Sequence, residues 1–187
     1  MNDRITRRAF SVSLMGSALA AGKIVHAQAQ PPVPTPPTPV QEELRDYPAP
    51  TFKPKLRKPR LGVTLIQDFV IFAHYDFDMV KKLLEKEPAV LNATVDWGGG
   101  DFESAMGGAS HMGKREIVEF LLTKGARPDL FTAAMLGHLD VVKSLLTAHP
   151  ALVAAKGPHG IPLLAHAKMG GKEAEEVFNY LSTLKHA

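Results

Sequence analysis

Apolar residues recur at helical spacing from about residue 63 to the end of the chain. In four segments a valine is followed by apolar residues three and four positions later, and these segments begin at Val80, Val118, Val142 and Val177. Positions i, i+3 and i+4 lie on one side of an α-helix. Each segment therefore predicts an amphipathic helix that buries one stripe of side chains.

A shorter helical pattern precedes these segments and ends in small residues and a glycine. Ala109-Ser110 and Ala133-Ala134 are such pairs, and the glycines that follow are Gly113, Gly137 and Gly170. Small residues let paired helices approach closely, and glycine allows a positive φ or a tight helix contact. The chain thus predicts about four helix–turn–helix units in succession.

These units resemble the ankyrin repeat over about residues 63–187. The residues that carry the resemblance are Ala133-Ala134-Met135-Leu136-Gly137-His138, Val141-Val142, Leu145-Leu146, Gly125-Ala126 and Pro162-Leu163. The resemblance implies an all-α fold, an ankyrin-repeat solenoid of about four helix-turn-helix repeats, preceded by a signal peptide and a Pro-rich linker. It also implies binding of partners through loop tips and the exposed face of the first helices.

The repeat period is irregular. Successive valine anchors are 38, 24 and 35 residues apart, against roughly 33 in ankyrin repeats. The long first interval contains an enlarged loop, Asp96-Trp97-Gly98-Gly99-Gly100-Asp101. The short interval passes from Gly125 directly into the next helix, which predicts that the usual β-hairpin is missing there.

The first 29 residues resemble a twin-arginine export signal. Arg7-Arg8 precede Phe10 and a mild apolar run that is too short to span a bilayer. Lys23 fits this route better than the general secretory route, although an ordinary signal peptide is the alternative. Either signal predicts a periplasmic or otherwise exported protein with no stable membrane insertion after signal cleavage.

Residues 30–62 are predicted to be a Pro-rich, partly basic and disordered linker. Ten of the fifteen prolines lie between Pro31 and Pro59, and so dense a run cannot form a helix or a central strand. We expect an extended spacer. Its basic side chains between Lys53 and Arg60 either contact anionic lipid or are simply solvated.

Charge and cysteine content narrow the choice of function. The chain has no cysteine, which excludes disulfides and thiolate metal sites. Its formal charge of +3 comes from the first 29 residues, because the remainder holds 18 basic and 18 acidic side chains. A neutral remainder gives no reason to expect nucleic-acid binding.

The histidines are the main candidates for chemistry. His74 and His111 fall at similar places in adjacent repeats, but stacked helices lie roughly 8–10 Å apart, which is wide for two ligands of one ion. His159 lies in a turn that leads into the helix carrying His166. A buried His166 predicts a hydrogen bond to a neighbour, with a ligand contact as the alternative. We predict no metal, no cofactor and no catalytic residue.

The loop around Trp97 has several interpretations. Asp96, Asp101 and Glu103 surround this single tryptophan, and they fit paired carboxylates, a cation site or a flexible acidic loop. We interpret Trp97 as an exposed contact residue for a partner. Packing onto Phe102 is the alternative.

The predicted function is protein–protein interaction in the periplasm by a monomeric scaffold or accessory factor. The predicted partner-binding residues lie on loop tips and first helices: Trp97, Asp101, His111, Met112, Met135, Lys168, Met169 and His159. One alternative is an accessory protein, folded before export, that carries a metal or small ligand near His111, His159 and His166. The other alternative is an enzyme that uses Asp101 or Glu103 with His111.

Overall fold

The computed structural model describes residues 46–184, and the chain divides into two units at Lys53 and Pro54. Residues 46–53 are exposed and contain no helix or strand. Residues 54–62 also contain no helix or strand, and Leu61 among them is partly buried against the core. The predicted export signal and the first part of the predicted linker lie outside the described residues.

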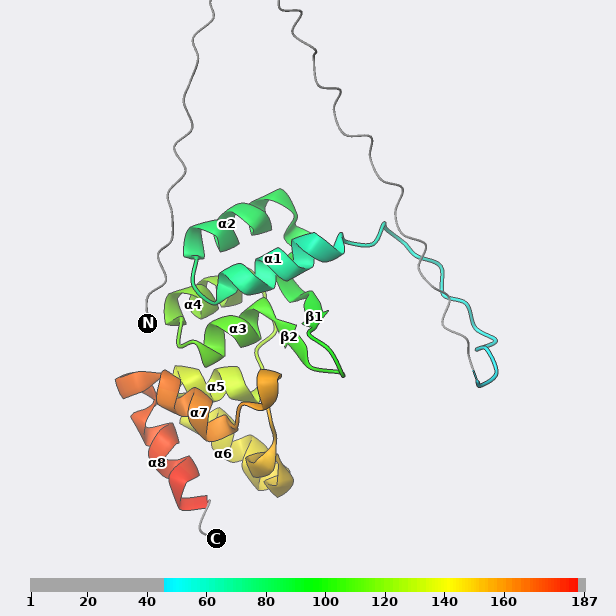
Figure 1. Cartoon of the computed structure of the whole chain (residues 1–187). Coiled ribbons are helices and arrows are strands. Elements are labelled where there is room, and N and C mark those ends of the chain that lie inside the picture. Colours follow the sequence, from blue (N-terminus) through cyan, green and yellow to red (C-terminus); the bar gives the residue numbers. More distant parts are fainter. Residues whose placement is uncertain (1–45, 185–187) are drawn as a thin grey trace, which may run out of the picture. The chain divides into compact units, whose positions relative to one another are not determined.

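The second unit is built from helices arranged in four consecutive pairs (Figure 1). The first helices of the pairs contact one another in the order α1, α3, α5 and α7. Within the described residues the α-helices are α1 (Val63–Ala73), α2 (Phe77–Lys86), α3 (Ala105–His111), α4 (Arg115–Thr123), α5 (Leu130–Leu136), α6 (Leu139–Ala148), α7 (Leu163–Met169) and α8 (Glu175–Leu184). The prediction of a mostly helical fold is confirmed.

Short 3-10 segments and one small sheet complete the described part of the chain. The 3-10 segments are η1 (Pro88–Asn92), η2 (Pro150–Ala154), η3 (Pro158–Gly160) and η4 (Gly171–Ala174). The sheet pairs β1 (Thr94–Asp96) with β2 (Phe102–Ser104) in antiparallel register, with Val95 opposite Glu103. The predicted enlarged loop is therefore the tip of a β-hairpin, whereas residues 125–129 connect α4 to α5 without a strand.

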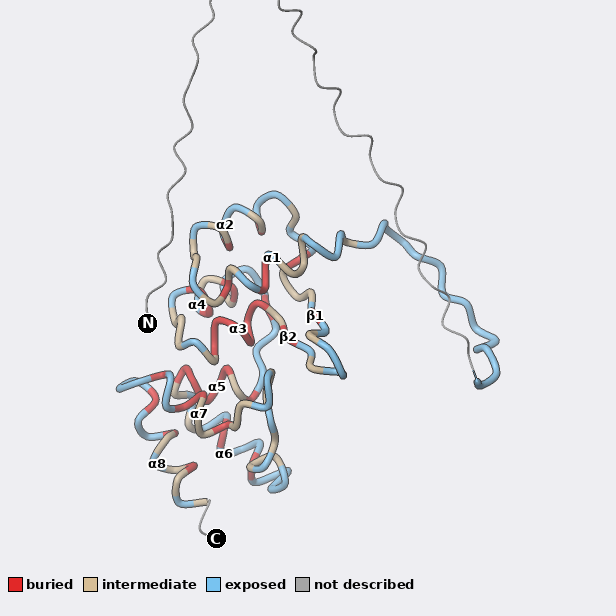
Figure 2. The backbone as a smooth tube through the Cα atoms, in the orientation of Figure 1, coloured by how far each residue is buried: buried red, intermediate tan, exposed pale blue. Residues whose placement is uncertain are grey.

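The valines that set the sequence pattern form the core. Val80, Val118, Val142 and Val177 are all fully buried, as the periodicity predicts. Buried side chains fall into two clusters, one running from α1 to α5 and the other from α5 to α8. Figure 2 shows them along the facing sides of the paired helices, with exposed residues outside.

Two glycines that follow first helices are required by the local geometry. Gly137 has a φ of 81°, and a Cβ there would collide with the carbonyl oxygen of Glu173. Gly170 has an ordinary φ of −70°, but a Cβ would collide with the carbonyl oxygen of Met135. The pairs thus pack backbone against backbone, which is the tight contact that the glycine pattern predicts.

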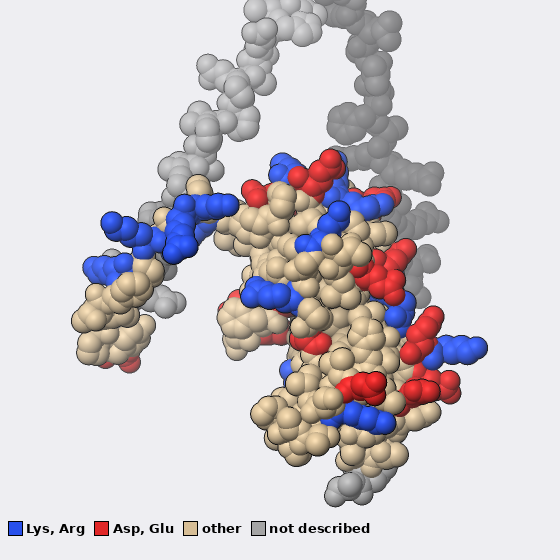
Figure 3. Space-filling model, turned by 180° about the vertical axis from the view of Figure 1, so that it is seen from behind, with Lys and Arg blue, Asp and Glu red and all other residues tan. Residues whose placement is uncertain are grey.

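Charged side chains of both signs lie on the face of the helical unit that Figure 3 shows. Figure 3 shows lysine and arginine concentrated along the segment before α1, while blue and red side chains are mixed over the helical unit. Among residues 46–184 no helix is long and apolar enough to cross a lipid bilayer.

Candidate metal centre

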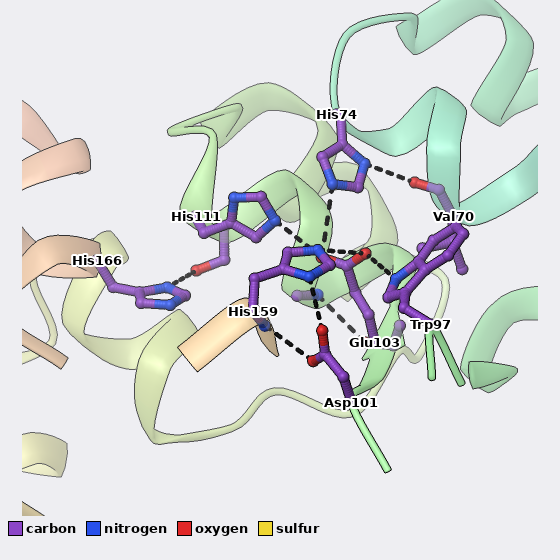
Figure 4. A network of polar contacts seen from close by, with 11 residues as sticks. Val70, His74, Trp97, Asp101, Glu103, His111, His159 and His166 are labelled. Atoms are coloured by element: carbon purple, nitrogen blue, oxygen red, sulfur yellow. Dashed lines mark hydrogen bonds and ion pairs between the residues drawn. The ribbon is translucent and has the colours of Figure 1, made fainter. Parts of the chain in front are cut away.

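The side chain of Glu103 lies at the centre of a polar cluster (Figure 4). Strand β2 alternates, so that Phe102 is exposed while Glu103 is buried, as expected for successive side chains on opposite faces of a strand. One carboxylate oxygen accepts a hydrogen bond from the Trp97 indole N–H at 2.7 Å, and the other accepts one from His111 Nε2 at 2.8 Å. A carboxylate is therefore held inside the protein by donors from the hairpin and from α3.

His74 enters the cluster from the end of α1. Its ring lies over Gly108 of α3, where a Cβ would come within 2.6 Å of the imidazole Cε1. The absence of a side chain at Gly108 lets the rings of His74 and His111 meet edge-on with centroids 4.9 Å apart. The expectation that these two histidines are too far apart to share an ion is therefore wrong, because it applied an average helix spacing to a contact made at glycine.

His159 reaches the cluster from the η3 turn. It has a φ of 58° and is the one non-glycine residue with positive φ among residues 46–184, a conformation that costs about 1–2 kcal/mol. Asp101 of the hairpin holds it there, because its carboxylate accepts from both the backbone N–H and the ring Nδ1–H of His159, each at 2.8 Å. Residues 58 positions apart are thus joined through one carboxylate.

The pKa values in the cluster favour charged carboxylates. Burial raises the pKa of Glu103, but the hydrogen bonds it accepts, led by the one from His111, outweigh burial and hold the pKa well below its usual range. The backbone hydrogen bond from His159 lowers the pKa of Asp101. The Glu103 carboxylate raises the pKa of His74, against a smaller opposing effect of burial. Two negative charges therefore face three imidazole rings.

The hydrogen-bond partners determine which ring nitrogens face Glu103 without a proton. His74 Nδ1 donates to the carbonyl oxygen of Val70 at 2.9 Å, and His159 Nδ1 donates to Asp101. In the neutral rings the Nε2 atoms then carry lone pairs, and they point at the Glu103 carboxylate from 3.5 and 3.4 Å. Lone pairs facing a carboxylate repel it, so the cluster requires either additional protons or a cation.

The distances are compatible with a cation. A protonated ring would approach the carboxylate to about 2.7–2.9 Å, which is shorter than the 3.4 and 3.5 Å observed. Four ligands at about 2.0–2.1 Å from a tetrahedral ion lie roughly 3.3–3.4 Å from one another. One ligand atom each from His74, Glu103, His111 and His159 lies within 4.8 Å of all the others. This outer limit is wider than the spacing around a bound ion, so binding would draw the four ligand atoms together, and His111 would join them by moving its proton to Nδ1.

The surroundings of the cluster match those of metal-binding histidines. Such rings usually donate their second N–H to a carbonyl or a carboxylate, which orients the ring toward the ion. Val70 does this for His74 and Asp101 does it for His159. The Nε2 atoms of two of the three imidazoles thus face the two oxygens of one carboxylate.

Several predicted partner-binding residues belong to this cluster instead. Trp97, His111 and His159 contact Glu103, while Asp101 binds His159. Trp97 is half-buried, and its N–H donates to Glu103. The sequence grouped Glu103 with this loop but gave it no role as a common centre, and it placed His74 apart. The equivalent positions of His74 and His111 in adjacent units were a correct signal, but the average helix spacing led to its rejection.

Of the remaining predicted partner-binding residues, one is buried and three are exposed. Met135 is fully buried, so its prediction as a partner-binding residue on the exposed face of a first helix is wrong. It packs between helix pairs, with its carbonyl oxygen against Gly170. Met112 and Met169 are 42 and 46% exposed. Lys168 is also exposed. These three remain on the surface as predicted.

His166 is buried beside the cluster and is not part of it. Its Nδ1 lies 3.1 Å from Ser110 Oγ, which confirms the expected hydrogen bond, and its Nε2 has no partner within the described residues. The prediction that it shares a ligand site with His111 and His159 is not supported by this geometry, because His74 takes that place.

Burial of His166 predicts that stability falls in mild acid. Burial lowers its pKa to about 4, with Asp129 opposing this and His111 adding to it. Between pH about 6.5 and 4 the unfolded chain binds a proton that the folded chain excludes, so stability is complete above this window and decreases as the pH falls through it. The difference amounts to about 3 kcal/mol at most.

Urea denaturation of the metal-free protein at pH 7 and pH 4.5 measures this effect. A His166→Asn variant should lose less stability between the two pH values than the unmodified protein does. The exposed His149 provides the control, since His149→Asn should leave the difference unchanged. Equal losses in all three proteins would contradict the assignment to His166.

Asp101 is expected to control metal affinity without touching the ion. Asp101→Asn removes the charge that orients His159, and changes of this kind cost about 10–100-fold in metal affinity. Competition with a chromophoric chelator measures the loss. Asp96→Asn is the matched control, because Asp96 lies on the same hairpin and its carboxylate bonds only to the N–H groups of Gly98 and Gly100.

Comparison with known proteins adds no assignment to this geometry. No protein-family model matches the chain, and no curated protein matches it. Function is therefore inferred from the chemistry of the cluster itself.

Proposed function

We propose that this protein binds one divalent transition-metal ion through His74, Glu103, His111 and His159. The observation that carries the proposal is that one ligand atom from each of these four residues lies within 4.8 Å of all the others, while the Nδ1 atoms of His74 and His159 are occupied by other hydrogen bonds. Imidazole and carboxylate ligands suit zinc, iron, nickel and copper(II). The absence of cysteine from the chain removes the thiolate ligands that favour copper(I).

The predicted export route is compatible with this function. The twin-arginine route carries proteins that are folded before transport, often with cofactors already bound. If the chain binds its ion in the cytoplasm, the identity of the bound metal is determined before export. Of the predicted functions, the exported accessory protein that carries a metal is thus the one that the cluster favours.

The ankyrin-repeat relationship is part of the same proposal. Four consecutive helix pairs, with first helices in contact and glycines at the tight turns, support it. In such a scaffold the sequences of the irregular turns can vary, because the stacking of the helices does not depend on them. The metal ligands come from the hairpin, the η3 turn and the ends of two first helices, which are positions of that kind.

Interaction with another protein is the second candidate function. Met112 and Met169 are exposed, and a Cβ at Gly113 would lie 3.6 Å from the Cβ of Met169. Met169 therefore lies beside the residue that follows Met112, and flexible methionines suit an adaptable contact surface. Loss of a co-purifying exported protein in a Met112→Glu/Met169→Glu variant, with metal content unchanged, would support this function. Retention would count against it.

Metal titration of the full chain tests the main proposal. The protein is stripped with a chelator and titrated with zinc by calorimetry, and native mass spectrometry counts the bound ions. We expect one ion per chain with sub-micromolar affinity, weakened strongly in His74→Ala and His159→Ala. His149→Ala is the control for a histidine outside the cluster. Failure to bind one ion, or equal affinity in all variants, would refute the proposal.

A further inference from the structure

A hollow of about 320 Å³ opens directly beside the proposed ion. It is lined by His74, Glu103 and His159 together with Ile71, Tyr75 and Trp97. Three of the four ligands thus form part of its wall, and His111 lies behind them. An ion held by the four ligands would have one side facing this hollow.

The exposure of the four ligand side chains also indicates that the ion is open on the side of the hollow. The side chains of Glu103 and His111 are 0 and 7% exposed, whereas those of His74 and His159 are 21 and 38% exposed. The ion is therefore enclosed on one side and reachable on the other. Zinc can expand from four to five ligands, and a fifth ligand from solution would have to enter on this open side.

We infer that the hollow binds a small monocarboxylate with a single-ring aromatic body, whose carboxylate completes the coordination of the ion. This inference rests on the proposed metal site. A divalent ion with one carboxylate ligand retains one positive charge, and Asp101 faces the opposite nitrogen of His159. A single negative charge on the incoming ligand balances the ion. No lysine or arginine lines the hollow among the described residues, so a multiply charged phosphate finds no partner there.

The apolar walls of the hollow determine which group can be attached to the ligand's carboxylate. Its outer walls are Ile71, Tyr75 and Trp97, and the first two are 40 and 61% exposed. The Tyr75 ring is supported edge-on by Phe72, with centroids 5.8 Å apart, so this wall is already formed. Apolar walls around one polar anchor are typical of small-molecule sites, and the volume is near the lower end of their range of about 300–1,000 Å³. One aromatic ring fits this space.

The test uses the full chain loaded with cobalt(II), whose visible absorption reports its coordination. Benzoate and acetate are the two probes, because they share the carboxylate and differ in the ring. We expect benzoate to change the spectrum in a saturable manner and to bind at least tenfold more tightly than acetate. Ile71→Ala and Tyr75→Ala should reduce benzoate affinity several-fold and leave the affinities for cobalt and acetate unchanged. Val141→Ala, at an exposed residue outside the hollow, should alter none of them.

The outcomes separate this inference from the function on which it rests. A chain that binds cobalt but whose spectrum responds to neither probe has a closed four-coordinate site, which overturns the inference and leaves the metal function intact. Equal affinity for the two probes also overturns it, because the hollow then contributes nothing. A chain that binds no cobalt refutes the metal function itself, and the inference with it.

Discussion

Replacing Glu103 with glutamine is expected to reduce zinc affinity more than a hundredfold. Glu103→Gln keeps the size of the side chain and can still accept a hydrogen bond, but it removes the one negative charge that all three imidazoles face. Alterations one step away from an ion already cost about 10–100-fold, so the loss of a charged ligand should exceed that range. Competition with a chromophoric chelator at pH 7 measures the change.

The control for this substitution is Glu119→Gln. Glu119 is an exposed residue of α4 that pairs only with Arg115 at 3.5 Å. Its replacement by glutamine should leave the zinc affinity unchanged. Circular dichroism of both metal-free variants establishes that the helices remain. A folded Glu103→Gln protein with undiminished affinity would show that the ion, if bound, is held elsewhere.

Replacing Gly137 with alanine is expected to destabilise the fold by about 3–5 kcal/mol, a range associated with severe packing defects. Two costs combine in Gly137→Ala. The φ of 81° is unfavourable for alanine, and the new Cβ would collide with the carbonyl oxygen of Glu173 in η4. A backbone carbonyl cannot rotate away as a side chain can, so the fourth helix pair must shift. Urea denaturation measures the loss.

Gly125→Ala isolates the steric part of this effect. Gly125 has a similar φ of 86°, but a Cβ there would meet nothing within 4 Å. It should therefore show only the conformational cost, about 1–2 kcal/mol. Similar losses for the two variants would mean that the helix pairs are not packed backbone against backbone at Gly137.

The sequence was sufficient to predict the helices because they depend on local periodicity. Val118 and Val142 are buried where the i, i+3, i+4 pattern placed them. The tight turn at Gly137 and the missing hairpin after Gly125 were also predicted, because glycine and chain length constrain the backbone directly. Met135 was misplaced because a first helix packs on neighbours from both adjacent pairs, which its own periodicity does not show.

The site was less predictable because it depends on contacts between distant residues. His74 meets His111 only because Gly108 has no side chain, and average helix spacing conceals that exception. His159 reaches Glu103 through a backbone conformation that sequence patterns disfavour. The histidines and the acidic hairpin could each be identified as candidates, but their common centre required the folded structure.

The hydrogen bonds from His159 to Asp101 affect how the helix pairs unfold locally. They link the turn before the last helix pair to the hairpin before the second pair, bypassing α5 and α6. In an array of stacked units the terminal unit ordinarily frays first, and a bound ion would fasten that end to the middle. Metal binding should therefore slow amide hydrogen exchange in α7 and α8 as much as in α3. The bound ion would couple the last helix pair to the second, so that both unfold in one cooperative event.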